Sequence, residues 1–373
     1  MVKYEVKLYY DGTLIGDISE IAQSLTWAKR RTKSGVDTID FTVNDVVLDR
    51  WCRQRNTTLG NILKPYALTC IVSRAGVDVV GGFLATMPGY SPKGTSADLQ
   101  MRFDGWMNLL AGVYIYPTAT QTARMGALAS QYIQMADTRA TNAGKAFGFT
   151  EGTISTMEQV DQTFENFKPV KEFLTDRCDN TTGAGQFDVY WHADKTYDIL
   201  KDNEFGDLIT DYVVRYPAMQ TGVSATTIQA SEKGGFASKI IALGAGEVSY
   251  DPEQNTVIKD EETNSTAVAE YGYVENLIQE SSISRMQTLT AKATTELYNA
   301  SNILWEPQIT LTGVQVAPTP NGTGKIWVGD TITIQNDEDM TGQTSGMFRV
   351  NELVVNRSAE GAEVINPVLE RVV

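Results

Sequence analysis

The stretch Val328-Gly329-Asp330-Thr331-Ile332-Thr333-Ile334 combines a turn with a half-buried strand. Gly329-Asp330 predicts the turn, and the isoleucines that follow it alternate with threonine, so both fall on one face of a strand. Residues 309–313 and 348–355 show similar strand-forming patterns on either side of it. Together these segments predict a β domain at the end of the chain.

A helix is predicted directly before these strands, over residues 284–301. Ser284 can cap its first turn, and Gln287 can reach back to complete a capping box. Pro307 marks the end of the helical stretch. Apolar residues spaced three and four apart define the buried face of this helix, which consists of Met286, Leu289, Ala293 and Leu297.

The order of these elements resembles the last part of phage tail hub proteins, a family that includes the hubs of contractile tails and of injection machines. In that family a helix leads into a strand, a Gly-Asp turn opens a short apolar strand, and an Arg-Val pair lies in the next one. Gly329-Asp330 and Arg349-Val350 match these features. On this stretch alone, a small β-barrel with a helical lead-in is the alternative interpretation.

The resemblance covers nearly the whole chain and implies a mainly β fold with an α+β insert. It divides the chain into a first β-barrel domain (1–115), a helical and hairpin insert (116–207) and a second β-barrel domain (208–373). Both barrels are expected to form part of a tube. In the first region, a step at Trp106 and Leu109-Leu110 matches the point where the family leaves its first barrel for the insert.

The first region carries its own strand signals. Tyr4, Val6 and Leu8 alternate with charged residues, and several further short strands follow at the spacing of a barrel or sandwich. A helical turn is expected over residues 46–55. The basic run Lys29-Arg30-Arg31 is either a nucleic-acid contact or a solvated face or salt-bridged interface. The acidic chain and the absence of interleaved aromatics favour the second interpretation.

The insert shows helical periodicity. Thr120 can cap its first helix, and Pro169 suits the first turn of its second. Two strands, 187–191 and 197–200, then form a hairpin around His192. The alternative is an independent α+β domain. The predicted buried faces of the two helices are Met125, Leu128, Ala129, Tyr132 and Ala136 in the first, and Val170, Phe173, Leu174 and Cys178 in the second.

The third region returns to β structure. Residues 237–243 predict a strand that ends at Gly244-Ala245-Gly246, which lacks the lysine and the following helix of a phosphate-binding loop. Residues 251–266 are acidic and poor in apolar side chains, so we expect an exposed and mobile polar loop there.

Composition narrows the classes of function. The 373 residues carry 31 Lys and Arg against 46 Asp and Glu, a formal net charge of −15, which disfavours sequence-specific binding to nucleic acid. No apolar run reaches the roughly 20 residues of a membrane span. The N-terminus enters a strand directly, so we expect no signal peptide and synthesis in the host cytoplasm.

No catalytic constellation stands out, and we predict no enzyme activity, no catalytic residues, no metal and no cofactor. The single histidine, His192, is expected to serve packing or the turn. Asp337-Glu338-Asp339 lacks the later ligands of a calcium loop and predicts a solvated loop. The three cysteines are expected to be buried thiols: Cys52, Cys70 and Cys178.

Together with the lack of a catalytic motif, the resemblance to tail hub proteins predicts a structural hub at the tip of a virion tail. The resemblance implies a homotrimeric ring that joins the distal tail protein and tail tube to tip or receptor-binding proteins, holds the tape-measure protein and gates the passage of DNA or cargo. The alternatives are a tail-associated cell-wall hydrolase, a carbohydrate-binding adhesion module, and the distal tail protein itself, which the helix-rich insert disfavours.

Overall fold

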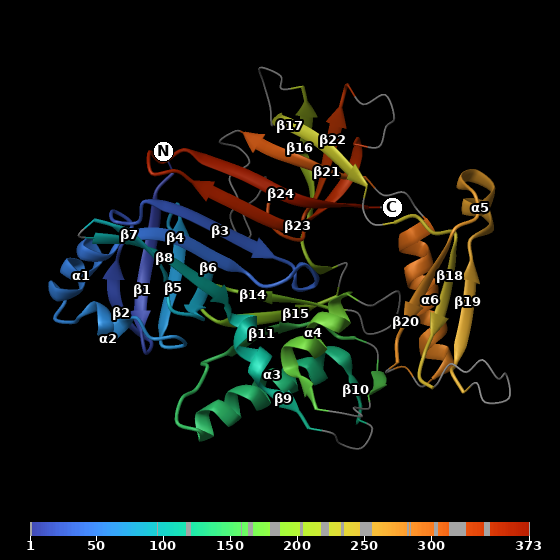
Figure 1. Ribbon diagram of the computed structural model, residues 1–373, viewed down its shortest axis with the longest axis horizontal. Helices are drawn as coiled ribbons and strands as arrows, with labels where there is room; N and C mark the ends of the chain where they lie inside the picture. Colours follow the sequence, from blue (N-terminus) through green and yellow to red (C-terminus); the bar gives the residue numbers. More distant parts are fainter. Residues whose placement is uncertain are drawn as a thin grey trace.

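The computed structural model of the protein describes residues 2–94, 96–116, 121–157, 159–162, 167–179, 187–201, 204–217, 224–232, 235–246, 256–281, 283, 285–301, 305–312, 326–338 and 344–372. Within these residues the fold is mainly β, with an inserted α+β region (Figure 1). The predicted fold class is confirmed. Among the described residues, no helix is both long enough and apolar enough to cross a bilayer.

The N-terminal region is a curved antiparallel sheet in the order β2-β1-β5-β6-β8-β4-β3, with β7 as a further partner of β8. Helix α1 (Asp45–Arg53) lies where the helical turn was predicted, and α2 (Leu59–Ile62) follows it. The strands are β1 (Tyr4–Tyr10), β2 (Thr13–Asp17), β3 (Ser24–Arg30), β4 (Thr38–Asn44), β5 (Leu68–Arg74), β6 (Val77–Leu84), β7 (Gly89–Lys93) and β8 (Ser96–Gly105).

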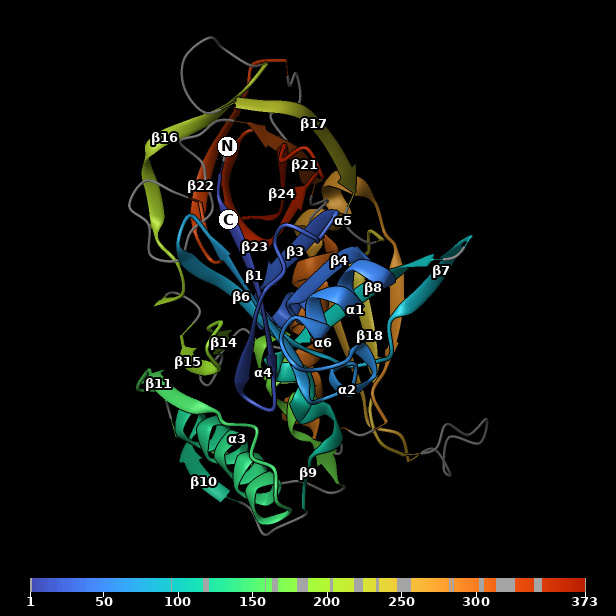
Figure 2. The same ribbon diagram turned by 90° about the vertical axis from the view of Figure 1, so that its left-hand side faces the viewer.

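The C-terminal strands close on themselves. Their order is β23-β22-β16-β17-β21-β24, and β24 pairs with β23 again, which completes a six-stranded ring (Figure 2). The predicted Gly-Asp turn precedes β22, and Ile332 and Ile334 both point into the core. The strands are β16 (Leu208–Tyr216), β17 (Ser224–Glu232), β21 (Trp305–Thr312), β22 (Thr331–Asn336), β23 (Gly346–Arg357) and β24 (Glu363–Arg371).

One continuous sheet joins the two regions. Strand β3 pairs with β23 from Leu25 opposite Arg357 to Arg30 opposite Glu352. A single hydrophobic core runs through both, and the rings of Trp27 and Trp327 meet within it at 6.2 Å. Pairing and packing therefore couple regions that lie more than 300 residues apart in the sequence.

The insert packs two helices, α3 (Met125–Asn142) and α4 (Val170–Asp179), near the sheet β11-β15-β14. The predicted buried faces of both helices are confirmed, because every one of those nine side chains is buried. Thr120 lies outside the described residues. The strands are β9 (Tyr114–Ile115), β10 (Gln121–Arg124), β11 (Thr150–Ile154), β12 (Gln159–Gln162), β13 (Lys168–Pro169), β14 (Asp188–Trp191) and β15 (Thr196–Leu200).

A small α/β unit stands apart from the ring (Figure 1). It consists of the sheet β19-β18-β20 with helices α5 and α6, and it has its own core. Three of the four predicted core residues of α6 are buried, but Met286 is exposed, and Ser284 lies outside the described residues. The elements are β18 (Lys239–Leu243), β19 (Lys259–Thr263), α5 (Ser265–Tyr271), β20 (Glu275–Gln279) and α6 (Met286–Ser301).

The prediction of a polar loop over residues 251–266 is wrong from residue 259 onward. Residues 259–263 form β19, which pairs with β18 along its whole length, and α5 begins at Ser265. Asn264 caps α5 by accepting hydrogen bonds from the backbone N–H groups of Thr266 and Ala267, both at 3.1 Å. Backbone pairing with β18 thus forms a strand that has no apolar periodicity. Residues 251–255 lie outside the described residues.

The predicted end of the helix at residue 301 is confirmed, because α6 ends at Ser301. Pro307 follows it inside β21, opposite Ala230 of β17.

Candidate functional site

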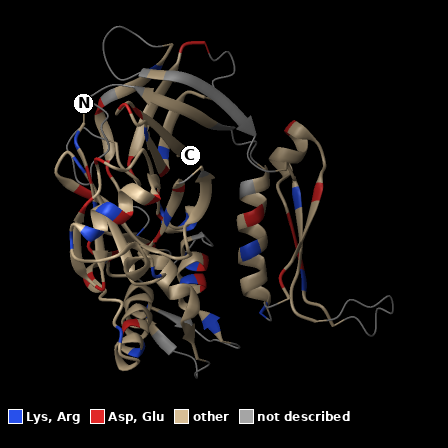
Figure 3. Ribbon diagram, turned by 60° about the vertical axis from the view of Figure 1, so that its left-hand side comes forward, with Lys and Arg blue, Asp and Glu red and all other residues tan. Residues whose placement is uncertain are grey.

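The basic run at the end of β3 lies where all three regions meet. Strand β3 has β4 on one side and β23 on the other, and the insert hairpin β14-β15 lies nearby (Figure 1). Basic and acidic positions are interspersed over the fold (Figure 3). Lys29 and Arg31 are only 1% and 2% exposed. We call this region, with its acidic partners, the junction.

Arg31 binds the insert and the ring together. Its Nε donates to Asp188 Oδ2 at 2.5 Å, and its Nη1 donates to Asn351 Oδ1 at 3.3 Å. The other carboxylate oxygen of Asp188 accepts from the backbone N–H of Thr32 at 3.0 Å. A buried ion pair whose oxygens all have donors is costly to break, since either partner alone would remain charged in the core.

Lys29 and Arg30 complete the junction. Lys29 Nζ lies 2.6 Å from Asp37 Oδ2 and also donates to the carbonyl oxygen of Trp191 in the insert. Arg30 Nη2 lies 2.6 Å from Glu352 Oε1 on β23, and its backbone N–H donates to Asp37. The salt-bridged alternative for the basic run is confirmed, and the side chains are directed at protein partners rather than at solvent.

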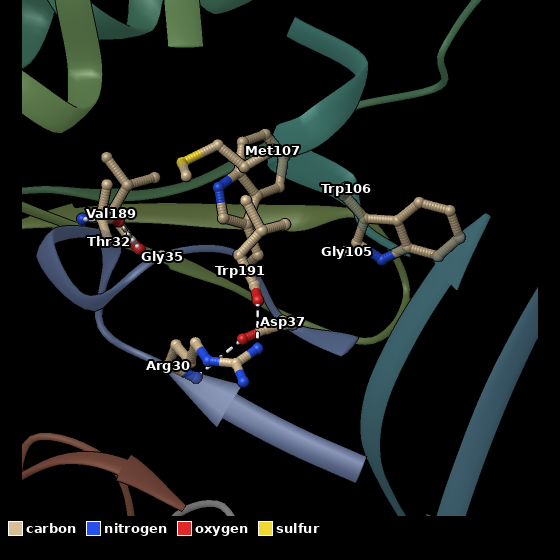
Figure 4. Close-up of a pocket in the computed structure, with 10 residues that line it drawn as sticks. Arg30, Thr32, Gly35, Asp37, Gly105, Trp106, Met107, Val189 and Trp191 are labelled. Carbon is tan, nitrogen blue, oxygen red and sulfur yellow. Dashed lines mark hydrogen bonds between the residues drawn. The ribbon is translucent and has the colours of Figure 1, made fainter. Parts of the chain in front are cut away.

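The cavity beside these residues is small. It has a volume of about 10 Å³ and is lined by residues of both the first region and the insert, including Gly105, Trp106 and Trp191 (Figure 4). A space of this size holds about one water molecule and no substrate. The contacts of the junction therefore hold the three regions together, and its cavity is too small for a substrate.

A close backbone approach brings the insert onto strand β6. A Cβ on Gly81 would lie 2.3 Å from the carbonyl oxygen of Ala193, which is too close for any side chain. Trp106 Nε1 donates to that same oxygen at 3.2 Å. Only glycine at position 81 permits this contact.

A second ion pair joins β5 of the first region to β24 of the ring. Arg74 donates to both carboxylate oxygens of Glu363, at 2.7 and 2.5 Å. Tyr4 also donates to Glu363. Burial alone raises the pKa of Glu363, but the hydrogen bonds from Arg74 and Tyr4 outweigh it and hold that pKa below its usual range.

The Gly329-Asp330 turn contacts the end of the insert at Phe205 and Asp207. Asp330 accepts from the backbone N–H of Asp207 at 2.9 Å and from that of Trp327 at 2.7 Å. Gly329 has φ +95°, and a Cβ there would lie 2.3 Å from the ring of Phe205. Burial raises the pKa of Asp330 to about 6 despite these hydrogen bonds.

Arg349, from the Arg-Val pair that matches the family, takes part in the same contact. Arg349 donates through Nε to the carbonyl oxygen of Gly329 at 3.1 Å and through Nη2 to that of Phe205. Trp327 Nε1 donates to the buried hydroxyl of Tyr190 in the insert at 2.9 Å. The Gly-Asp and Arg-Val pairs therefore act together to attach the insert to the ring.

His192 lies at the end of the hairpin. Its Nε2 is 2.7 Å from Asp198 Oδ2, and its ring packs edge-on against Tyr190 at 4.7 Å. Burial raises the pKa of Asp198, but the hydrogen bonds from His192 and from the backbone N–H of Thr153, with the attraction to His192, together outweigh burial and lower that pKa. These contacts fit a packing and turn role.

The cysteines are buried free thiols, as predicted: Cys52, Cys70 and Cys178. Burial raises the pKa of Cys52 to about 11, so it is a poor nucleophile. In the described part of the chain, no group of three or more His, Cys, Asp or Glu side chains is placed to hold a metal ion. Asp337 and Glu338 are exposed, and Asp339 lies outside the described residues.

The acidic partners of the two buried arginines, Arg31 in the junction and Arg74 on β5, could not be found from the sequence. Asp188 lies 157 positions from Arg31, and Glu363 lies 289 positions from Arg74. For Arg31, the signal in the sequence was a basic run at the end of an otherwise apolar strand. Such a run fits a solvent-exposed face as well as a face that binds an acidic partner, and it does not identify the partner.

No family model and no curated protein sequence matches the chain. Solved structures do. A 43 kDa tail protein of prophage MuSo2 from Shewanella oneidensis is 12% identical, with a TM-score of 0.64 over 98% of both chains. A tail protein from Neisseria meningitidis is 11% identical, with a TM-score of 0.57 over 98% of this chain and 96% of its own.

Prophage tail protein gp18 from Listeria monocytogenes is also similar, with 11% identity and a TM-score of 0.52. That match covers 98% of this chain and 94% of the Listeria chain. Because all three alignments run nearly end to end, they include the joined sheets, the insert and the α/β unit together. The chain has the fold of phage tail proteins.

Proposed function

We propose that this chain is the structural hub of a phage tail tip or of a phage-derived injection device. The observation that carries the proposal is the continuous sheet through β3 and β23, which joins two β regions in a fold shared with solved tail proteins. A protein that bears load between a tube and its tip needs such a rigid connection, and the junction supplies buried ion pairs beside it.

The hub forms a homotrimeric ring in this proposal. A tail tube built of sixfold rings meets a threefold ring only where each subunit presents two similar units. The curved sheet of the N-terminal region and the closed ring of the C-terminal region are candidates for these units, which correspond to residues 1–115 and 208–373. The subunit contacts are head-to-tail and close at three copies.

The proposed partners are the distal tail protein and tail tube on one side, and tip or receptor-binding proteins on the other. The ring also holds the tape-measure protein and gates DNA or cargo at the virion tail tip. A net charge of −15 suits a conduit, because it repels phosphates instead of retaining them. Assembly takes place in the host cytoplasm.

The decisive experiment is a reconstruction of the assembled particle by electron cryomicroscopy. We expect three copies of this chain in one ring, with both β regions lining the tube. Six copies per ring, or a location away from the tube axis, would overturn the hub proposal.

Two assays separate the alternatives. Clearing of peptidoglycan in a zymogram by the purified chain would favour a cell-wall hydrolase. Specific binding on a glycan array, in the absence of clearing, would favour an adhesion module. For a hub, both assays should be negative, while the reconstruction shows the ring.

A further inference from the structure

Helix α3 and strand β9 lie at the end of the insert that faces away from the ring (Figure 1). Exposed aromatic side chains gather there, in and next to β9 and against α3. Tyr114, Tyr116 and Phe167 are 46%, 54% and 61% exposed. The rings of Tyr116 and Phe167 meet edge to face at 5.3 Å. Such a cluster of exposed aromatics on a soluble protein marks an interaction surface more often than chance exposure.

Arg139 lies against this cluster. Its guanidinium carbon is 4.1 Å from the centre of the Tyr116 ring, and its Nη1 donates to the carbonyl oxygen of Tyr114 at 2.7 Å. These contacts fix the position of the group. No carboxylate among the described residues forms an ion pair with Arg139, so its remaining donors are available to a ligand.

An open groove of about 280 Å³ runs beside Arg139. One wall is a face of α3, where Ala136 and Ala140 lie one turn apart on either side of the arginine. The other walls are mainly apolar and are formed by Gly112, Val113, Tyr114, Tyr116 and Phe147. The groove therefore combines small and aromatic apolar surfaces with a single positioned cation.

We propose that this groove docks a peptide segment of a partner protein, in which an apolar side chain lies next to an aspartate or glutamate. The apolar side chain would enter between α3 and Phe147, and the carboxylate would bind Arg139. Complementary charge supports this choice, because Arg139 forms no ion pair with any acidic side chain in the part of the chain that the structure describes. Tyrosine and arginine are also the residues that most often dominate binding at protein interfaces.

A glycan fits the groove less well. Sugars stack on an open aromatic face, but Arg139 covers one face of Tyr116, and the rings of Tyr116 and Phe167 already meet edge to face. The lining side chains also offer few polar groups for sugar hydroxyls: Arg139 and the tyrosine hydroxyls. The inference is independent of the hub function, since any tail protein that binds a partner could use it.

The test selects binders from a displayed random peptide library against the full chain, and measures selected peptides by fluorescence polarisation. We expect the selected sequences to share an acidic residue beside aliphatic or aromatic ones. Arg139→Gln should weaken binding about tenfold or more, because it removes a charge-assisted hydrogen bond. Tyr116→Ala should weaken it to a similar extent.

Two matched controls keep the result interpretable. Arg53→Gln removes an exposed arginine on α1, and Tyr90→Ala removes an exposed tyrosine on β7, both away from the groove. Neither should change peptide binding, and all four variants should keep the wild-type melting temperature. The inference fails if no peptide is selected, if the selected peptides lack acidic residues, or if Arg139→Gln binds them as well as wild type. If the chain binds a glycan on an array and Tyr116→Ala abolishes that binding, the ligand of the groove is a sugar and the peptide proposal is wrong.

Discussion

The joined β regions and the small α/β unit are stabilised in different ways. The joined regions share one hydrophobic core, one continuous sheet, and buried ion pairs at Arg31 and Arg74. The unit has a core of six buried residues, and no strand of its sheet pairs with the main sheet among the described residues. The joined regions are therefore held together by strand pairing, packing and ion pairs between residues far apart in the sequence, whereas the unit is held together by its own small core.

The largest effect is expected from Arg31→Ala. Removing the arginine leaves Asp188 charged and buried, which should lower the free energy of unfolding by about 3–5 kcal/mol. Urea denaturation of the purified chain measures this. The exposed Arg53→Ala, which removes only a surface pair with Asp49, should change it by less than about 1 kcal/mol.

A double variant separates the ion pair from simple loss of packing. Arg31→Met combined with Asp188→Leu removes both charges and should recover most of the stability lost by Arg31→Ala. If Arg31→Met, Asp188→Leu and the double variant all lower the free energy of unfolding by the same amount, the ion pair contributes packing alone. The contrast with the α/β unit would then have no basis.

Asp330 gives the joined regions a pH dependence. Its pKa is raised by burial to about 6 in the folded protein, against 3.8 ordinarily, so the folded state holds the proton more tightly than the unfolded state. The contribution of this group to stability therefore increases as the pH falls from about 6 to about 4, and it decreases as the pH rises through that range.

The matching variant is Asp330→Asn, which cannot ionise. The difference in unfolding free energy between wild type and this variant should shift in favour of wild type by up to about 3 kcal/mol as the pH falls from about 6 to about 4. Denaturant titrations at several pH values measure it. Glu338→Gln, at an exposed position, serves as the control. A difference between wild type and Asp330→Asn that does not change with pH would contradict the raised pKa of the Asp330 carboxyl.

Much of the fold follows from periodicity. The buried faces of α3 and α4, and the alternation of Ile332 and Ile334 in β22, appear in the structure as the sequence predicts. These patterns are local, so a short window contains the information. Met286 fits the same helical period but is exposed, and it is the first residue of α6.

The candidate site was less predictable for a physical reason. The sequence shows only a run of basic residues at positions 29–31. Their burial depends on carboxylates, two of which, Asp188 and Glu352, are far away in the sequence. Strand β19 was missed because Lys259-Asp260-Glu261-Glu262-Thr263 has no apolar residue. Its position comes from backbone pairing with β18 and from the contact of Lys239 Nζ with Glu261 Oε2 at 2.7 Å.

Leu289→Ala tests the independence of the α/β unit. Leu289 is fully buried in the small core beside Ile240 and Ala293, so truncation should destabilise the unit by about 2–5 kcal/mol. Hydrogen exchange followed by mass spectrometry should show faster exchange in β18 and α6 and unchanged exchange in β3 and β23. Leu277→Ala, at an exposed position on β20, is the control and should leave both patterns as in wild type.

Removal of the whole unit should have the smallest effect on the joined regions. Strands β17 and β21 are antiparallel neighbours, and Glu232 lies opposite Trp305 where the chain leaves for the unit and returns from it. Because these ends are already adjacent, a short Gly/Ser linker in place of residues 235–301 converts the insertion into an ordinary hairpin connection. We expect the shortened chain to fold, with the urea midpoint of the main transition close to that of wild type. A shortened chain that is insoluble, or one whose β3 and β23 amides lose protection, would show that the unit stabilises the ring and that the two regions are one cooperative structure.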